Sequence, residues 1–436
     1  MSSKEEQSPL RARLPLLAAA LAIALVFIAL NYRAYDGYFQ DDELDNISWA
    51  PRVTPAEFGA AFAKPFFDVS NFRPVGHLYF ALMGAEFNED FPPYMTPVFA
   101  IHLINGLLLF LLLRRLRVGD WHALAAVAFF LLSASAFDAY RKPMYVFDLL
   151  CTCFSLTSLL LWSHRRWVLS FVAFWCAYKS KELAVMLPLA LLAWEHWFGD
   201  RRYLRLIPFL LVSLSFGIQG ILLNPNKDNE YTFRFNWQAL AATVPFYARR
   251  IFLFRGSGLL LILLLFIGDR RVLFGLAATA CFFFTLLFLP GRLYEAYTYL
   301  PLACIAIALA AFATRTKPAW AWLVLALWMP MNLRHLRAEE RAALAADDNA
   351  FAFVDSINHW AAKNSDITTL IYDGLPSGFH NWGASAAWNL AHRTLHLFAY
   401  YRDLPEAKQA LASRAVAWAE WNDAAHKLTV TPRPKN

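Results

Sequence analysis

Long apolar runs, separated by short polar segments, dominate the chain. The first run begins at residue 14, after Arg11 and Arg13, and reaches Leu30 with no small-residue cleavage site, so we expect an uncleaved first span. A helix needs about 20 apolar residues to cross a bilayer. The pattern predicts an all-α polytopic membrane protein with eleven spans. We place these spans at 14–31, 94–113, 121–137, 145–163, 166–178, 183–198, 205–223, 252–268, 271–289, 297–313 and 318–333.

Basic residues occur in every second short loop between the predicted spans. These residues are Arg114, Arg115, Arg117, Arg165, Arg166, Arg201, Arg202, Arg205, Arg270, Arg271, Arg315 and Lys317. Because cytoplasmic loops carry the excess of Lys and Arg, residues 1–13 are predicted to be a cytoplasmic tail. The domain 14–334 is then a transmembrane bundle whose long first loop, 32–93, faces the other side. We expect a bacterial inner membrane, with the C-terminus in the periplasm.

Two polar segments are long enough to have structure of their own. In the first loop, Thr54 and Glu57 form a capping box around Pro55, which predicts a short amphipathic helix. Its face of Phe58, Phe62 and Phe66 would lie on the membrane surface or pack against the bundle. Residues 335–436 are predicted to be a small periplasmic α/β domain. It should contain helices at 337–363 and 405–420 and a strand at 367–372, with a turn at Asp373-Gly374.

Composition argues against a nucleic-acid partner and against a site built from cysteines. The chain is 58% hydrophobic and carries a net charge of +7. Its basic residues are scattered among short loops and form no basic domain, so we expect no nucleic-acid partner. All five cysteines lie in predicted spans, and we therefore expect neither a structural disulfide nor a zinc cluster.

Asp41, Asp42 and Glu43 stand together shortly after the first span. Adjacent carboxylates repel, and partial burial raises the pKa of at least one of them. Such a group suits a general base that activates a hydroxyl nucleophile, and carboxylate oxygens are also ligands for a divalent cation. A solvated acidic turn is the structural alternative.

Cations lie at the outer membrane edges, where the positive-inside rule disfavours them. They are Arg73 (followed by His77), Arg141, Lys142, Lys179, Lys181, Arg249, Arg250 and Arg292. An anionic ligand such as a lipid phosphate would account for them. The alternative is neutralisation by Glu182, Glu295 or the acidic cluster. Within a span, His102 and Asn105 share a helix face, which suggests either an interhelical hydrogen bond or a ligand.

Outward carboxylates, outward cations and an apolar bundle together indicate a membrane enzyme that uses a lipid-linked anionic donor. Five stretches, in this order and spacing, resemble the membrane portion of the TMTC-type protein O-mannosyltransferases and their bacterial relatives, within the GT-C superfamily. They are YFQDDELDN at 38–46, NFRPVGHLYFAL at 71–82, FAIHLINGLLLFLLLRRL at 99–116, KSKELAVMLPLALLAWEHW at 179–197 and RLYEAYTYLPLACIAIALA at 292–310. The resemblance covers residues 14–330.

The resemblance implies a glycosyltransferase that moves a sugar from a polyprenyl-monophosphate donor to an acceptor hydroxyl, with inversion. Asp41 or Asp42 would be the catalytic base, and the same pair would hold a divalent cation if one is used. The family's Arg-Pro, Lys-Glu and Tyr-Leu-Pro motifs match Arg73-Pro74, Lys181-Glu182 and Tyr299-Leu300-Pro301.

The remaining expectations concern the sugar and the phosphate. Tyr294 and Tyr297 are expected to line the sugar pocket, while Glu43, His77 and Glu295 complete the candidate substrate-binding set. Relatives often have Glu-Arg-Tyr where this chain has Glu295-Ala296-Tyr297, so the cation is either supplied by Arg292 or lost. The family's tetratricopeptide repeats are absent, which leaves protein, lipid and polysaccharide open as acceptors. Two other functions remain: a transporter or flippase of lipid-linked sugars, and a non-catalytic envelope assembly protein.

Overall fold

The computed structural model describes residues 9–67, 72–223 and 228–433. The chain forms two compact units. Unit 1 comprises Met1–Tyr32, Phe62–Val75 and Val98–Leu336, and unit 2 comprises Arg33–Ala61, Gly76–Pro97 and Arg337–Asn436. Most of the predicted first loop therefore belongs to the same unit as the C-terminal segment.

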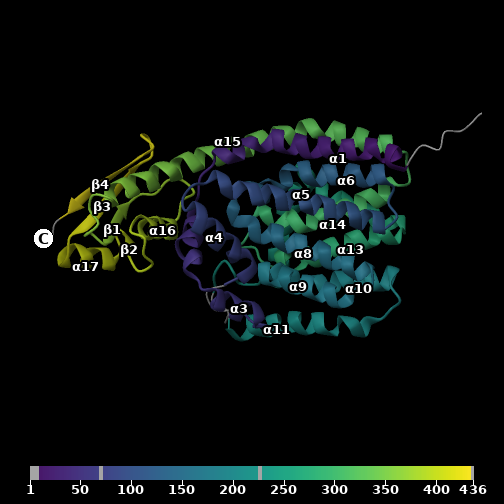
Figure 1. The fold of residues 1–436 in the computed structure, drawn as a ribbon, viewed down its shortest axis with the longest axis horizontal. Coiled ribbons are helices and arrows are strands. Elements are labelled where there is room, and N and C mark those ends of the chain that lie inside the picture. Colours follow the sequence, from purple (N-terminus) through teal and green to yellow (C-terminus); the bar gives the residue numbers. More distant parts are fainter. Residues whose placement is uncertain (1–8, 68–71, 224–227, 434–436) are drawn as a thin grey trace, which may run out of the picture. The chain divides into compact units, whose positions relative to one another are not determined.

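Unit 1 is a bundle of apolar helices (Figure 1). Its α-helices are α1 (Pro9–Asn31), most of α5 (Pro92–Arg115), α6 (Asp120–Leu132), α7 (Phe137–Arg141), α8 (Val146–Ser163), α9 (Trp167–Ser180), α10 (Leu187–Phe198), α11 (Ile207–Leu223), α12 (Trp237–Phe252), α13 (Arg270–Leu287), α14 (Tyr299–Ala313) and the start of α15 (Pro318–Ala361). Short 3₁₀ turns join several of them, including η5 (Glu182–Met186) and η8 (Glu295–Thr298). Helix α8 packs against α9, and α13 packs against both α10 and α14.

Six helical segments among the described residues are long and apolar enough to cross a membrane. They are Leu14–Asp36, Pro92–Arg115, Pro143–Ser163, Tyr203–Gly220, Arg270–Leu287 and Glu295–Ala313. Two bent helix pairs would raise the number to eight. The predicted spans 166–178 and 183–198 correspond to α9 and α10, which have only 14 and 12 residues. Both are shorter than the roughly 20 residues that a crossing helix needs.

The predicted span 252–268 is not an α-helix. Residues 237–252, expected to lie in an outer loop, form α12, and a 3₁₀ segment, η7 (Ser257–Ile267), follows at a bend of 83°. Leu253 and Gly256 both adopt left-handed backbone conformations at this bend, with φ of 66° and 70°. Helical hydrogen bonding cannot continue through such residues, so α12 ends at Phe252 and the apolar run after it forms only the separate 3₁₀ segment.

Burial separates the helices that face lipid from those that form the centre of the bundle. Only 17% of the apolar stretch in α1, and 17% of that in α11, is buried, against 78% in the stretch Glu295–Ala313. Leu17, Leu21 and Leu214 are among the exposed side chains. Exposed leucines of this number are expected where lipid rather than water is the solvent, and they support a membrane-embedded bundle.

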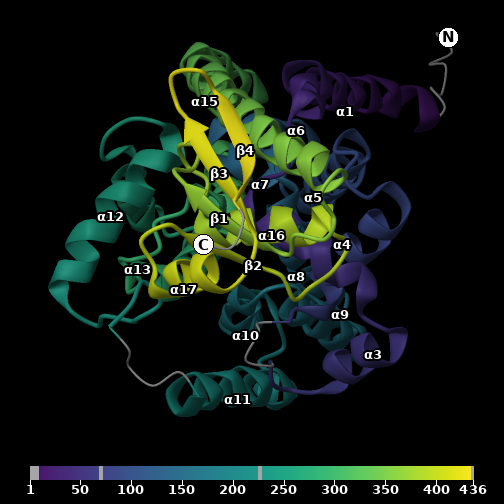
Figure 2. The same ribbon diagram turned by 90° about the vertical axis from the view of Figure 1, so that its left-hand side faces the viewer.

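Unit 2 combines short helices with a four-stranded sheet (Figure 2). Its helices are α2 (Asp41–Trp49), most of α3 (Pro55–Ala63), most of α4 (Pro74–Phe87), the end of α15, α16 (Asn381–Ala391) and α17 (Pro405–Ser413). The strands are β1 (Thr369–Asp373), β2 (Phe398–Tyr401), β3 (Val416–Asn422) and β4 (Lys427–Arg433). The sheet order is β2-β1-β3-β4, with β1 parallel to its two neighbours and β3 antiparallel to β4.

Local sequence signals were right in part of unit 2. The capping box is present, because the Glu57 carboxylate accepts hydrogen bonds from the backbone and hydroxyl of Thr54, both at 2.8 Å. The predicted second helix, 405–420, is wrong in its second half: α17 ends at Ser413, and β3 follows. Strand β3 alternates side chains between two faces, and Val416 joins Ile371, Ala407 and Ala410 in the small core.

We predict that Gly275→Ala destabilises the bundle. A Cβ atom at residue 275 would lie 2.6 Å from the backbone nitrogen of Ala308, so α13 and α14 would have to separate. Overpacking of this kind costs about 1–3 kcal/mol. Gly217→Ala in α11 is the matched control, because nothing lies within 4 Å of its Cβ position. Thermal unfolding of the full chain in lipid nanodiscs should show a lower midpoint for Gly275→Ala only; equal midpoints would contradict the close packing.

Candidate functional site

The acidic cluster forms the first turn of α2. Negative charge is favoured at this position because the helix N-terminus exposes unpaired N–H groups. Glu43 completes a capping box, since its Oε2 accepts a hydrogen bond from the backbone of Gln40 at 2.9 Å. Glu43 is only 3% exposed, so its position is explained by helix capping.

Asp41 is held by a residue 339 positions further along the chain. Its Oδ1 accepts a hydrogen bond from the backbone N–H of His380 at 2.8 Å, and its Oδ2 lies 2.6 Å from Nδ1 of the same imidazole. His380 precedes α16, so the carboxylate lies at the N-terminus of that helix. Gly383 makes this approach possible, because a Cβ atom there would clash with Asp41.

Asp42 remains exposed beside this pair. Its Oδ1 accepts a hydrogen bond of 2.9 Å from the indole Nε1 of Trp382. The Trp382 ring stacks on the His380 ring, with centroids 4.4 Å apart and planes inclined by 13°. Asp41 and Asp42 are therefore both oriented by the segment that begins α16, but only Asp42 presents its carboxylate to solvent.

Asp45 lies one turn further along α2. Part of its surface is exposed, but protein atoms crowd the carboxyl and this desolvation raises its pKa above the ordinary 3.8. The negative charge of Asp42 adds to the rise, and a hydrogen bond with the Trp49 side chain opposes it. The Trp49 ring in turn packs against His77, at 4.7 Å between centroids. His77, predicted to bind substrate, is a buried residue that supports Trp49.

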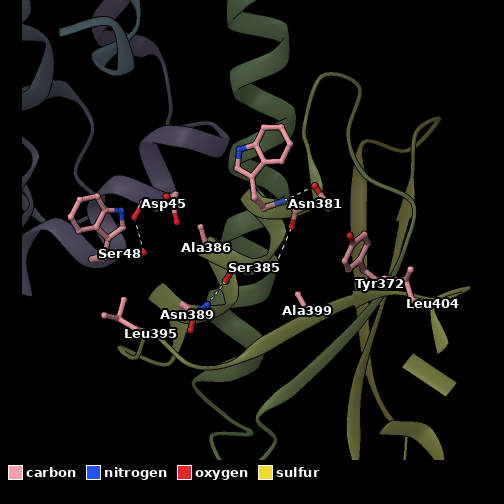
Figure 3. A pocket seen from close by; sticks show the side chains of 12 residues that line it. Asp45, Ser48, Tyr372, Asn381, Ser385, Ala386, Asn389, Leu395, Ala399 and Leu404 are labelled. Carbon is pink, nitrogen blue, oxygen red and sulfur yellow. Dashed lines mark hydrogen bonds between the residues drawn. The ribbon is translucent and has the colours of Figure 1, made fainter. Parts of the chain in front are cut away.

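A cavity of about 500 Å³ lies next to these carboxylates in unit 2. Helix α2 contributes Asp45, Ser48 and Trp49, and α16 contributes Asn381, Trp382 and Ser385. Figure 3 shows the side chains of the two helices around the cavity, with Tyr372 of β1 on the side of the sheet. The volume lies in the range of roughly 300–1,000 Å³ that is common for small-molecule sites.

Unit 1 holds a separate network of charges. Lys181 Nζ lies 2.6 Å and 2.5 Å from the two carboxylate oxygens of Asp148 in α8. Arg73 Nε lies 2.6 Å from Glu182 Oε1. Burial acts to raise the pKa of Glu182, but the Arg73 guanidinium outweighs it and holds the pKa below its ordinary value. The charges of Arg73 and Lys181 are therefore both neutralised by carboxylates, which is the alternative to an anionic ligand for these two cations.

Aromatic rings continue this network. Lys181 Nζ lies 4.4 Å from the centre of the Tyr297 ring, and the Tyr297 hydroxyl accepts a hydrogen bond from Arg292 at 3.3 Å. The Arg292 guanidinium also lies over the rings of Tyr231 and Tyr294, at 4.4 Å and 4.5 Å. The structure thus brings together four predicted residues of unit 1: Lys181, Arg292, Tyr294 and Tyr297. An Arg stacked on two rings keeps its charge while its orientation is restricted.

The other predicted cations lie in varied surroundings. Arg250 forms an ion pair with Glu295, so neutralisation accounts for it as well. Arg141 is buried and Arg249 is exposed. Lys142 follows α7 and is partly buried. For Arg141, Lys142 and Arg249, a phosphate-binding role stays a prediction.

Residues that lie far along the chain from their partners could not be identified from local patterns. No signal at His380 or Trp382 indicated a contact with Asp41 or Asp42. Asp148, with Asp138, could be recognised from the sequence as an acid that flanks Arg141 and Lys142 in an apolar region, but its contact with Lys181 could not. His102 and Asn105 share Tyr299 as a partner, at 2.6 Å and 3.1 Å from its hydroxyl, which supports the interhelical hydrogen bond.

The chain matches no protein-family model, and no curated protein matches it. Among the described residues, no group of three or more His, Cys, Asp or Glu side chains is arranged to hold a metal ion.

We predict that Lys181→Met strongly destabilises unit 1, because it leaves the Asp148 carboxylate buried without its cation. Removing one partner of a buried pair costs about 3–5 kcal/mol. The double variant Lys181→Met/Asp148→Leu should recover most of the loss, and Lys317→Met, at an exposed lysine, is the control. Thermal unfolding in nanodiscs measures each. If the double variant is no more stable than Lys181→Met, charge compensation is not the role of Lys181.

We predict that Asp45→Asn stabilises unit 2 at neutral pH. A raised pKa means that the folded state keeps a proton above pH 3.8, where the unfolded chain has lost it, so stability falls as pH rises through this window. Removing the charge should raise the unfolding midpoint by about 1–2 °C at pH 7, with a smaller gain at pH 4.5. Asp36→Asn, whose side chain is 65% exposed, is the control. A gain that is the same at both pH values would contradict this assignment.

Proposed function

We propose that the chain is an integral-membrane glycosyltransferase of the GT-C type. It would move a sugar from a polyprenyl-monophosphate donor to an acceptor hydroxyl on the extracytoplasmic side. The observation that carries this proposal is the arrangement of Asp41 and Asp42. Both carboxylates are fixed by partners from α16, and a cavity of ligand size lies beside them. Such preorganisation is expected of a general base.

We assign the role of base to Asp42 and a positioning role to Asp41. Asp42 is exposed, whereas Asp41 is 7% exposed and has both oxygens engaged by His380. Asp42 would take the proton of the acceptor hydroxyl as that oxygen bonds to the anomeric carbon. The bond between the anomeric carbon and the phosphate oxygen breaks, its electron pair stays on the phosphate, and the anomeric centre inverts.

The apolar bundle of unit 1 suits a lipid-linked donor. Its proposed phosphate partners are Arg292 and Lys181, together with the Tyr297 hydroxyl. Cations and hydroxyl donors that are already oriented stabilise negative charge as it develops on a leaving group. Each of these two cations has a carboxylate partner, Glu230 for Arg292 and Asp148 for Lys181. Arg73 and Arg250 are paired in the same way, and the contacts to Tyr297 are what distinguish Arg292 and Lys181 from them.

Topology forms part of the same proposal. A GT-C enzyme of this kind would have eleven spans, with a cytoplasmic N-terminus and a periplasmic C-terminus in a bacterial inner membrane. The distribution of Arg and Lys among the short loops supports that orientation. Helices α9 and α10, too short to cross alone in a straight path, would then span a locally thinner region or end within the bundle.

The acidic pair does not suit a chelated divalent cation. Both oxygens of Asp41 already accept hydrogen bonds from His380, and Asp42 accepts one from Trp382. A hard cation needs several oxygen ligands directed at one point. We therefore derive no step that uses a metal.

We predict that Asp42→Asn lowers donor turnover by at least about 10²-fold, the usual contribution of a general base. The purified chain would be placed in liposomes with radiolabelled polyprenyl-monophosphate sugars, and release of sugar to water or to a membrane extract would be measured. Asp41→Asn should also reduce turnover, because it loosens the attachment of α2 to His380. Asp36→Asn, an acid that precedes α2 and lies outside the cluster, should retain wild-type turnover.

Two outcomes would contradict the proposal. If a folded Asp42→Asn variant consumes donor at the wild-type rate, Asp42 is not the base. If no donor is consumed but intact lipid-linked sugar moves between the leaflets, the chain is a transporter. The hydrogen bonds of His102 and Asn105 to Tyr299 weigh against the second outcome, because these polar groups serve contacts between helices.

A further inference from the structure

The cavity of unit 2 combines aromatic rings with uncharged hydrogen-bonding groups. Trp49, Trp382 and Tyr372 supply the rings, while Asn381 and Ser385 supply an amide and a hydroxyl. Asp45 is the only carboxylate that lines it, and no Lys or Arg lines it among the described residues. A phosphate or nucleotide would meet a negative charge without a compensating cation, so the cavity suits a neutral ligand.

Both indole rings are held in place although solvent reaches them. Trp382 is 46% exposed, yet its Nε1–H is bonded to Asp42 and one face lies on the His380 ring. Trp49 packs on His77 and is hydrogen-bonded to Asp45. Exposed indoles usually move among rotamers, and fixing them in advance reduces the entropy lost on binding. Such rings form flat apolar platforms of fixed orientation.

Polar groups of the cavity lie close to these platforms. The Asn381 oxygen accepts the backbone N–H of Trp382 at 3.0 Å, which leaves its amide N–H groups as donors in the described part of the chain. The Asp45 carboxylate provides an acceptor. A pyranose ring has the matching character, with an apolar face of C–H groups and hydroxyls around its edge that both donate and accept. An acyl chain would leave the polar groups unsatisfied.

We infer that this cavity binds a saccharide, and that the acceptor of the transferred sugar is therefore a glycan. The acceptor role rests on the proposed function, whereas saccharide binding does not. The Trp382 side chain lines the cavity and also donates to Asp42, so a sugar stacked on Trp382 would lie near the proposed base.

Binding of oligosaccharides to the full chain tests this inference. The chain would be held in lipid nanodiscs, because maltoside detergents are themselves saccharides. Probes would be the neutral tetrasaccharides of mannose, glucose and N-acetylglucosamine, with a serine-rich peptide of similar size as the competing class. Saturation-transfer NMR and calorimetry would report contact and affinity. At least one tetrasaccharide should bind, with ring protons nearest the protein.

Variants locate the site. Trp382→Ala should weaken binding at least tenfold, and Trp382→Phe, which keeps a ring, should weaken it less. Ser385→Trp adds bulk to the cavity without removing a contact to Asp41 or Asp42, and it should also abolish binding. Trp237→Ala, at a tryptophan in α12 of unit 1 that is 78% exposed, is the control and should bind as the wild type does. Thermal unfolding would confirm that each variant is folded.

The outcomes separate this inference from the proposed function. If no tetrasaccharide binds while the donor is still hydrolysed to water, the saccharide site is wrong and the glycosyltransferase stands. If a tetrasaccharide binds through Trp382 but no donor is consumed, the saccharide site stands and the transferase fails. Binding of the peptide alone, or saccharide binding that Ser385→Trp and Trp382→Ala leave unchanged, would overturn the inference.

Discussion

The two hydrogen bonds between Asp41 and His380 hold α2 against the start of α16 in unit 2. One carboxylate accepts both the backbone N–H and the imidazole of a single residue, which fixes α2 in position and angle at the start of α16. Most of the residues that line the cavity come from these same two helices, so its shape depends in large part on this contact. An acid that the sequence marks as a candidate base is thus also the residue that orders the surroundings of its neighbour, Asp42.

In unit 1, buried cations and carboxylates are paired with each other. Lys181 and Arg73 each have a carboxylate at hydrogen-bonding distance, so the buried network is close to neutral. Buried ion pairs add little net stability but are costly to break, and they fix geometry. Arg292 also has a carboxylate partner, Glu230 at 3.2 Å, and its guanidinium lies over the rings of Tyr231 and Tyr294. The rings restrict its orientation, and this distinguishes it from Arg73 and Lys181.

Features that depend on a short stretch of sequence were predicted correctly in two cases. The apolar runs predicted a helical membrane protein, and Thr54 and Glu57 predicted a helix start. Predictions failed where backbone conformation overrode apolar character, as at Leu253 and Gly256, and where a helical pattern concealed strand β3. The Asp41–His380 contact could not be predicted, because 339 residues separate the partners and neither has a distinctive local pattern.

Gly383 has a consequence for how this chain can change over time. Any larger side chain at 383 would occupy space that Asp41 now fills. A substitution at 383 is therefore tolerable only after residue 41 has become smaller, and a smaller residue at 41 gives up the bonds to His380. The effects of substitutions at 41 and 383 therefore depend on the order in which they occur. While Asp41 is present, position 383 is closed to larger residues, although a glycine has no side chain of its own to make a contact.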